Sequence, residues 1–507
     1  MTTDQSDWFA AIDLGSNSFH LLVVRHHEGR LQVRDRHREM VRLAAGLDSD
    51  GNLSEESQER ALACLSRFGE RIRNLPRYNV RIVGTNALRR ARNASDFALR
   101  ASALLGREIE IISGREEARL IFSGVSYALE DDEERRLVVD IGGGSTELIL
   151  GYRARPRLTE SLHMGCVTMS QAYFDDGGIS KARMREARLA AMQELAPIKA
   201  VFRGLAWESV VGASGTMLAI ADILAAEGWS QEGISADGLA RLVRALIEAG
   251  HVDRLMLEGL SPERRAVFPG GVAILQALMR SFELERIQVS SGALREGVVI
   301  DLLGRFEHND IRNDSARDLA TRFHVDEAHA ARVKHTALRL FDGVASEFAG
   351  NTSMFRNILG WAAQVHEIGL DIAHTQYHKH GGYLLSHMDL PGFSQGEQRR
   401  MSLLVRAHRR KFPVQEFSLL DATERQVMLK LACILRLAVL LHRGRTEAAS
   451  APVSLDIAGK RIALKFLSDW LEHHPLTRLD LEQECAFLAD AGIGLEIRDG
   501  SVEEAAK

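Results

Sequence analysis

The sequence predicts an α/β protein of two related lobes, followed by a helical domain and a small α+β domain at the C-terminal end. The first observation is a duplication, since the segment AIDLGSNSFHLLVV at 11–24 is echoed by VDIGGGSTELIL at 139–150, with matching Asp, Gly, Ser and Leu residues 127 positions apart. The second is that helix and strand patterns alternate after each copy. The third is that long helical periodicity replaces strand signals from Ile311 onward. The 507 residues allow three or four domains.

Composition and charge exclude several classes of protein. With 45% hydrophobic residues, 26% charged residues and nine prolines, the chain is typical of folded proteins rather than fibrous or disordered ones. The formal net charge of −5 does not indicate binding to nucleic acid, so any polyanion must be held locally. The four cysteines are far apart without a CxxC pair, which argues against a disulfide framework and fits a reducing cytoplasm. The polar N-terminal segment and the absence of a long apolar run predict neither a signal peptide nor a membrane span.

Each copy of the duplicated segment is predicted to form a β-hairpin: a buried strand ending in Asp, a tight Gly/Ser turn and a second strand. Helices and further strands follow each hairpin. In the first lobe we expect a helix over 54–74 with Ala61, Leu65, Phe68 and Ile72 on one face, and strands at 81–83 and 108–112. In the second lobe we expect a strand at 209–212, an apolar helix ending near Gly228 and a strand at 286–290.

The second half of the chain has a different character. Twelve of the 19 histidines fall between His324 and His474, within the predicted helical and terminal domains. The terminal domain is expected to contain strands at 454–457 and 461–466, a helix at 479–489 and a strand at 494–497. The predicted domains are 1–130 and 131–305 for the two lobes, 306–448 for the helical domain and 449–507 for the terminal domain.

The two Gly/Ser turns suggest a phosphate site. Glycine permits close approach of backbone N–H groups to an anion, although a single such turn also closes ordinary hairpins. Two turns, each with a carboxylate, can face one another and hold a phosphate with its Mg²⁺, which favours oxygen ligands. Asp140 and Glu147 are seven residues apart across the second turn, so both can reach one ion; alternatively, Glu147 is a solvated strand residue. The turn residues proposed to bind phosphate are Asp13, Ser16, Asn17 and Ser18 in the first hairpin and Gly142, Gly143, Gly144 and Ser145 in the second.

A carboxylate at a helix start is the candidate general base. Ser113 and Glu116 form the pattern of a capping box, which gives Glu116 a structural role. Glu117 lies about 100° further around the helix and is available to deprotonate an attacking water. The alternative is a surface carboxylate favoured by the helix dipole.

Further anion-binding candidates are spread along the chain. Ser214, Gly215 and Thr216 precede a helix and could bind an anion, although plain N-capping explains them equally well. Arg89 and Arg295 are candidate phosphate ligands, because a guanidinium binds two phosphate oxygens at once.

The helical domain offers two more groups of residues. Its histidines could form a metal site. We favour the alternative that they are solvated or core histidines, because a histidine-aspartate metallohydrolase would have Asp where Glu367 stands. The histidines concerned are His335, His366, His374, His378, His380 and His387. A basic run could hold phosphates or simply be a solvated helix face, and comprises Arg406, His408, Arg409, Arg410 and Lys411.

Taken together, these motifs resemble the exopolyphosphatase and guanosine pentaphosphate phosphohydrolase family. The resemblance covers nearly the whole chain and rests on DLGSNSFH at 13–20, SGREEARLI at 113–121, DIGGGSTE at 140–147, GASGT at 212–216, GALREG at 292–297, HEIGL at 366–370 and DLPGF at 389–393. It implies an actin-like (ribonuclease-H-like) fold of two lobes, followed by a helical domain similar to histidine-aspartate domains and a small terminal domain. It also implies Glu117 as the catalytic base, Mg²⁺ on Asp140 and Glu147, and phosphate contacts from Asp13, Asn17, Arg89, Gly143, Gly144 and Ser145.

Two activities occur within this family. Gly144 and the basic run resemble the polyphosphatase branch, whereas VRLAAGL at 41–47 resembles the pentaphosphate branch. We favour an exopolyphosphatase that removes the terminal phosphate of inorganic polyphosphate processively, because a long polyanion needs a basic track and the sequence reveals no guanine pocket. The alternatives are hydrolysis of guanosine pentaphosphate (pppGpp) and a phosphate-ligand sensor without turnover. The resemblance also implies a homodimer, and we expect a cytoplasmic protein, with peripheral attachment to the inner membrane left open.

Overall fold

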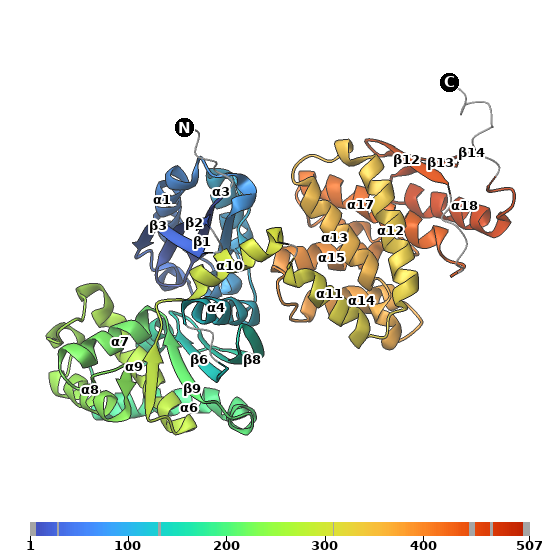
Figure 1. Cartoon of the computed structure of the whole chain (residues 1–507). Coiled ribbons are helices and arrows are strands. Elements are labelled where there is room, and N and C mark those ends of the chain that lie inside the picture. Colours follow the sequence, from blue (N-terminus) through green and yellow to red (C-terminus); the bar gives the residue numbers. More distant parts are fainter. Residues whose placement is uncertain are drawn as a thin grey trace. The chain divides into compact units, whose positions relative to one another are not determined.

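The computed structural model describes residues 7–27, 30–129, 133–307, 309–445, 452–466 and 470–499. The chain divides into two compact units, Met1–Asp310 and Ile311–Lys507 (Figure 1). The predicted domain boundaries at 130–131 and 448–449 lie outside the described residues. No helix in the described part of the chain is long and apolar enough to cross a bilayer.

The first lobe is a five-stranded sheet with a hairpin at its centre. β1 pairs antiparallel with β2 and parallel with β4, and Asp13 of β1 stands opposite His20 of β2. Helix α1 begins after Ser54, whose side chain accepts from the amide of Ser57, and it buries the predicted apolar face against the sheet. The strand order is β3 (Arg30–Glu39), β2 (Phe19–His27), β1 (Trp8–Leu14), β4 (Val80–Gly84), β5 (Glu110–Ile111), and the helices are α1 (Glu55–Ile72), α2 (Asn86–Arg90), α3 (Ala94–Leu105) and α4 (Gly114–Ala128).

The second lobe repeats this arrangement and adds one edge strand. β6 pairs antiparallel with β7 and parallel with β9, and Asp140 stands opposite Glu147. The duplication seen in the sequence is therefore a duplication of sheet topology. The strand order is β8 (Arg155–Leu162), β7 (Thr146–Tyr152), β6 (Arg135–Ile141), β9 (Ser209–Ala213), β11 (Arg286–Val289), β10 (Ile234–Ser235), and the helices are α5 (Cys166–Tyr173), α6 (Lys181–Gly204), α7 (Gly215–Ala226), α8 (Ala236–Ala249), α9 (Phe268–Phe282) and α10 (Leu294–Phe306).

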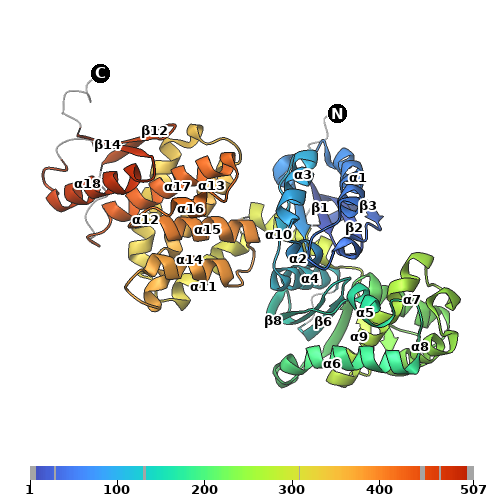
Figure 2. The same ribbon diagram turned by 180° about the vertical axis from the view of Figure 1, so that it is seen from behind.

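Helices α4 and α10 lie between the two lobes and share one apolar core with both sheets (Figures 1 and 2). Their backbones touch at two glycines. A Cβ atom on Gly124 would lie 2.0 Å from the carbonyl oxygen of Ala293, and one on Gly297 would lie 1.8 Å from that of Leu120. A larger residue at either position would force the helices apart, so these glycines fix where α4 begins relative to both sheets.

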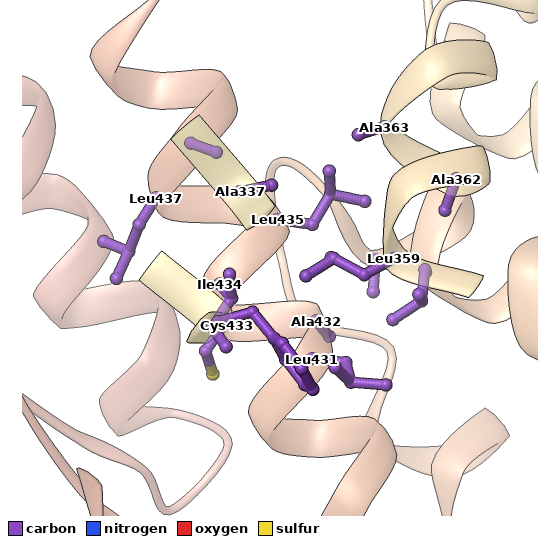
Figure 3. Close-up of a cluster of buried hydrophobic side chains, with 14 of the residues drawn as sticks. Ala337, Leu359, Ala362, Ala363, Leu431, Ala432, Cys433, Ile434, Leu435 and Leu437 are labelled. Atoms are coloured by element: carbon purple, nitrogen blue, oxygen red, sulfur yellow. The ribbon is translucent and has the colours of Figure 1, made fainter. Parts of the chain in front are cut away.

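The second unit is a helical bundle that carries a three-stranded sheet. Side chains of α12, α13 and α17 meet in its core, part of which is shown in Figure 3. The sheet, in the order β12-β13-β14, contributes Leu455, Leu464 and Phe466 to the same core, so the terminal segment packs onto the bundle. The elements are α11 (Ile311–Arg322), α12 (Glu327–Gly343), α13 (Thr352–Val365), α14 (Tyr377–His387), α15 (Gln395–Ala407), α16 (Val414–Phe417), α17 (Ala422–Leu441), β12 (Val453–Ala458), β13 (Arg461–Phe466), α18 (Pro475–Ala489) and β14 (Gly494–Asp499).

Candidate active site

Side chains alternate between the two faces of a strand, and this alternation places Asp13, Asp140 and Glu147 on the faces directed toward the layer between the lobes. Ala11 on β1, Val138 on β6 and Ile149 on β7 all belong to the core that includes α4 and α10. Asp13, Asp140 and Glu147 are each two residues away from one of these along their strands and therefore lie on the same faces. As a directly opposed antiparallel pair, Asp140 and Glu147 have Cβ atoms about 5 Å apart.

The tips of the two hairpins meet. A Cβ atom on Gly143 would lie 3.1 Å from the Cβ of Ser16, and one on Gly144 would lie 2.4 Å from Oδ1 of Asn86 on α2. Ser16 and Ser145 are buried there. Glycine is therefore required at position 144 for the second tip to close on the first lobe. The structure thus brings together the turn residues that the sequence singles out.

Glu117 lies in the first turn of α4 and points inward rather than to solvent. Its side chain is 10% exposed, and its Oε2 accepts a hydrogen bond of 2.7 Å from Nη1 of Arg89. The same nitrogen donates to the carbonyl oxygen of Ile112 at 3.0 Å. The helix begins as predicted, because the Ser113 hydroxyl accepts from the amide of Glu116. The Glu116 carboxylate itself binds the guanidinium of Arg119, so it has the structural role predicted for it, although with a different partner.

We call Asp13, Glu117, Asp140 and Glu147 the carboxylate cluster. Burial raises the pKa of Asp13 to about 7, and the charge of Glu117 acts in the same direction. Burial and the charge of Glu117 likewise raise the pKa values of Asp140 and Glu147 well above their usual range. The charge of Glu117 therefore acts on each of these three carboxylates, and all four belong to one site.

This cluster has the features of a Mg²⁺ site. Its oxygens are the hard ligands that Mg²⁺ prefers. Oδ1 of Asp13 is buried without a hydrogen-bond partner among the described residues. Burial and, after it, repulsion from Glu117 raise the pKa values of Asp13 and Asp140, and a divalent cation would offset both effects. The Ser161 hydroxyl, 2.8 Å from Oε1 of Glu147, orients one of the two predicted ligands.

A neutral histidine lies beside this cluster. Nη1 of Arg295 donates to Nδ1 of His20 at 2.9 Å, and Nε2 of His20 is 2.9 Å from Oγ of Ser18. Burial and the charge of Arg295 lower the pKa of His20 to about 3. Because Arg295 can only donate, Nδ1 must accept and Nε2 carries the proton, which it donates to Ser18. The Ser18 hydroxyl hydrogen is then available to an anion.

Two further arginines adjoin this chain of hydrogen bonds, and sequence reasoning missed both. Arg38 and Arg264 also act to lower the pKa of His20, and burial and the charge of Arg38 lower the pKa of Arg264. Nη2 of Arg264 lies 2.2 Å from where a Cβ atom of Gly215 would stand, at the start of α7. We call Arg38, Arg264 and Arg295 the arginine group. No motif marks Arg38 or Arg264, because β3 and the segment before α9 supply them.

The predicted anion site at the start of α7 is occupied by a structural contact. Oγ of Ser214 accepts from the amide of Met217 and donates to the carbonyl of Ile141 at 3.0 Å. This is the N-capping alternative. Thr216 is buried and Gly215 is exposed next to Arg264. A phosphate role for these three residues stays a prediction.

The basic run in the helical domain does not form a continuous exposed track. His408 is only 2% exposed, Arg406 pairs with Glu416 at 3.2 Å, and Arg409 stacks on the ring of Tyr377. Only Arg410 and Lys411 are exposed. His408 continues the buried face of α15 one turn after Leu404, so its environment is set by helical periodicity rather than by the charge of its neighbours. The six histidines that the sequence singles out divide into exposed ones (His335, His374 and His387), a half-buried one (His380) and buried ones (His366 and His378).

Comparison with known proteins identifies relatives over nearly the full length. Residues 22–306 match the model of the Ppx/GppA phosphatase family, and residues 311–485 match that of Ppx/GppA phosphatase, domain III. The guanosine-5′-triphosphate,3′-diphosphate pyrophosphatase of Aeromonas hydrophila is 40% identical over 94% of this chain and 96% of its own length. The enzyme of the same name from Vibrio cholerae is 40% identical over 97% of this chain and 98% of its own.

Solved structures confirm the fold over the part of the chain that they cover. An exopolyphosphatase from Cytophaga hutchinsonii superposes with a TM-score of 0.53 at 24% identity, covering 59% of this chain and 98% of that one. The Ppx/GppA family member from Aquifex aeolicus superposes with a TM-score of 0.50 at 25% identity, covering 60% of this chain and 98% of that one.

The comparisons overturn the exopolyphosphatase prediction. The full-length relatives at about 40% identity are named for a guanosine pentaphosphate, not for polyphosphate. The physical reason for the error is the basic run, whose central histidine is buried and two of whose arginines have partners within the domain. The segment 41–47, which resembles the pentaphosphate branch, was the better indicator of the substrate.

Proposed function

This chain belongs to the Ppx/GppA phosphatase family, and we propose that it hydrolyses the terminal 5′-phosphate of pppGpp, releasing orthophosphate and ppGpp. The proposal rests on the names of the full-length relatives and on one structural observation. Glu117, a carboxylate held by Arg89, stands in the same buried site as Asp13, Asp140 and Glu147. The residues that we propose as the base and as oxygen ligands for a cation therefore lie where the two lobes meet.

The reaction would be a direct attack of water on the terminal phosphorus. Glu117 accepts a proton from the water as its oxygen bonds to phosphorus, and the bond from phosphorus to the bridging oxygen breaks, leaving ppGpp. Arg89 orients Glu117 and contributes positive charge beside the transferred group. Mg²⁺ bound by Asp140 and Glu147 would neutralise charge on the phosphate oxygens.

The arginine group suits a substrate with two separate anionic groups. A pppGpp molecule carries a triphosphate at its 5′ position and a diphosphate at its 3′ position. The arginine group lies around His20, and His20 stands opposite Asp13 in the first hairpin. Positive charge therefore adjoins the carboxylate cluster. A guanidinium binds phosphate oxygens in pairs, and we propose that this group holds the 3′-diphosphate while the terminal 5′-phosphate lies at the cluster.

Hydrolysis in water enriched with oxygen-18 tests the reaction and its position. Purified full-length protein is incubated with pppGpp and Mg²⁺, and the products are separated and weighed by mass spectrometry. We expect ppGpp and orthophosphate in equal amounts, with one labelled oxygen in the orthophosphate and none in ppGpp. Recovery of intact pppGpp from a protein that binds it would contradict the proposal and favour the sensor alternative.

A further inference from the structure

Two buried histidines in the second unit have the same unusual environment. His366 follows α13 and is fully buried, and His408 follows α15 and is 2% exposed. In each, Nδ1 bonds to the carbonyl oxygen three residues earlier, at 2.7 Å for Ala363 and 2.6 Å for Val405. Carbonyl oxygens only accept, so Nδ1 carries the proton in both rings.

This arrangement leaves two lone pairs buried without a partner. In a neutral imidazole with a protonated Nδ1, Nε2 can only accept, and neither Nε2 has a hydrogen-bond partner among the described residues. A buried acceptor without a donor is uncommon in folded proteins, and these two nitrogens are therefore candidate ligand atoms.

Two of the buried histidines, His329 and His366, lie close to the Glu367 carboxylate. The ring of His366 is 5.7 Å from that of His329 and 5.3 Å from that of His408, measured between centroids. Nε2 of His329 lies 4.0 Å from Oε1 of Glu367. One ligand atom from each of His329, His366 and Glu367 lies within 4.8 Å of the other two, and all three residues are buried. Within the described ranges, no other three His, Cys, Asp or Glu residues meet this condition.

We propose that His329, His366 and Glu367 bind a divalent transition-metal ion, of which Zn²⁺ is the expected occupant. Two imidazoles and one carboxylate form a ligand set that Zn²⁺ accepts readily and that Mg²⁺, which prefers oxygen, does not. The bond from Nδ1 of His366 to a carbonyl oxygen is the outer contact typical of a metal-binding histidine. Three protein ligands would leave a fourth position for water or an anion.

In the structure, Arg445 balances the charge of Glu367. Its guanidinium binds the Glu367 carboxylate and also contacts Oδ2 of Asp326 at 3.2 Å, while its side chain is 45% exposed. A bound cation would compete with this guanidinium for Glu367, and Asp326 offers Arg445 a second partner. His442, another buried histidine nearby, is engaged by the Thr336 hydroxyl at 2.7 Å and is not a candidate ligand.

The sequence alone favours solvated or core histidines here, partly because Glu replaces the expected Asp at position 367. His329 is not among the histidines that the sequence singles out. It stands in the first turn of α12 and six residues before the exposed His335, and the chain provides no local motif that joins it to His366. Packing of α12 against α13 brings the two together.

Metal binding to the full-length protein tests the proposal. The chain is stripped with a chelator, returned to millimolar Mg²⁺ so that the carboxylate cluster is saturated, and titrated with Co²⁺ and with Zn²⁺ against a chromogenic chelator. We expect one ion per chain, with the visible absorption of Co²⁺ bound to nitrogen in a site of low coordination number. The variants His329→Gln and His366→Gln should each lose at least about 100-fold in affinity.

Two control variants separate this site from surface binding and from the active site. His335→Gln changes an exposed histidine on the same helix and should bind the ion as the wild type does. Glu117→Gln alters the carboxylate cluster and should also leave Zn²⁺ affinity unchanged. If a ligand variant folds poorly, a rise in Tm with Zn²⁺ in the wild type that is missing in His329→Gln supports the site. A wild-type chain that takes up no Zn²⁺ under these conditions, or ligand variants that bind it with wild-type affinity, would overturn the proposal.

Discussion

Replacing Glu117 by Gln should abolish catalysis while leaving the fold intact. The side chain is nearly buried, and its amide counterpart has the same shape and keeps an oxygen to accept from Arg89 at 2.7 Å. The change removes the charge pair with Arg89, which destabilises, and also removes the repulsion that raises the pKa values of Asp13 and Asp140, which stabilises. Because these two effects oppose one another, we expect the free energy of unfolding to change by less than about 2 kcal/mol.

The kinetic effect should be much larger. A positioned general base contributes about 10²- to 10⁴-fold, or about 3 to 5 kcal/mol of activation free energy. An amide cannot take a proton from water, so kcat for pppGpp should fall by this factor while KM changes little. The assay is steady-state phosphate release with Mg²⁺, paired with urea unfolding of the same preparation.

The neighbouring residue provides a matched control. Glu116 binds Arg119 through two hydrogen bonds of 2.8 Å inside the protein, so Glu116→Gln should lower the free energy of unfolding by about 3 kcal/mol. Its kcat, measured well below the unfolding temperature, should stay near the wild-type value. A folded Glu117→Gln protein that retains more than a tenth of wild-type kcat would refute the assignment of Glu117 as the base.

Three further outcomes are expected from the contacts described above. In Mg²⁺-free protein, burial raises the pKa of Asp13 from 3.8 to about 7, so its contribution to stability is fully present below pH 4 and is lost as the pH rises through 7. The free energy of unfolding of Asp13→Asn should therefore exceed that of the wild type by up to about 4 kcal/mol at pH 8 and by nothing at pH 4. An equal difference at both pH values in urea unfolding would contradict this. Arg264→Met should raise KM for pppGpp about 10- to 100-fold, with a smaller change in KM for GTP, which lacks the 3′-diphosphate. Equal changes for both substrates would argue against the arginine group as the site of the 3′-diphosphate. Gly124→Ala should lower the free energy of unfolding by about 3 kcal/mol in urea unfolding, because its Cβ atom meets the backbone of α10. Gly204→Ala is the control, since a Cβ atom there meets no other segment of the described chain within 4 Å, and it should lower the free energy of unfolding little or not at all.

Much of the fold and the centre of the site can be predicted from local sequence patterns. The hairpin that pairs Asp140 with Glu147 is predictable because two alternating strands flank a short Gly/Ser turn, and a seven-residue spacing then places both on one face. The inward position of Glu117 depends on the Ser113 cap, which fixes the phase of the helix. The duplication, visible as a constant offset of 127 residues, predicts the matching sheets.

The remainder depends on packing between distant segments. Arg264 reaches the start of α7, and Arg38 acts on His20, only because the strands and lobes are assembled as they are. The basic run predicts an exposed track wrongly, because helical periodicity and not charge sets which of its residues are exposed. That periodicity buries His408 one turn after Leu404. His20 could have been found, because it holds in the first hairpin the position that Glu147 holds in the second.

The central claim is that the carboxylate cluster and the arginine group together act on a guanosine pentaphosphate. The most direct measurement is kcat/KM of the wild-type protein for pppGpp and for a long inorganic polyphosphate, under identical Mg²⁺ and salt. We predict that pppGpp is preferred by at least about 100-fold, the discrimination expected from two charge-assisted phosphate contacts that polyphosphate does not make in the same geometry. Equal values, or a preference for polyphosphate, would contradict the account.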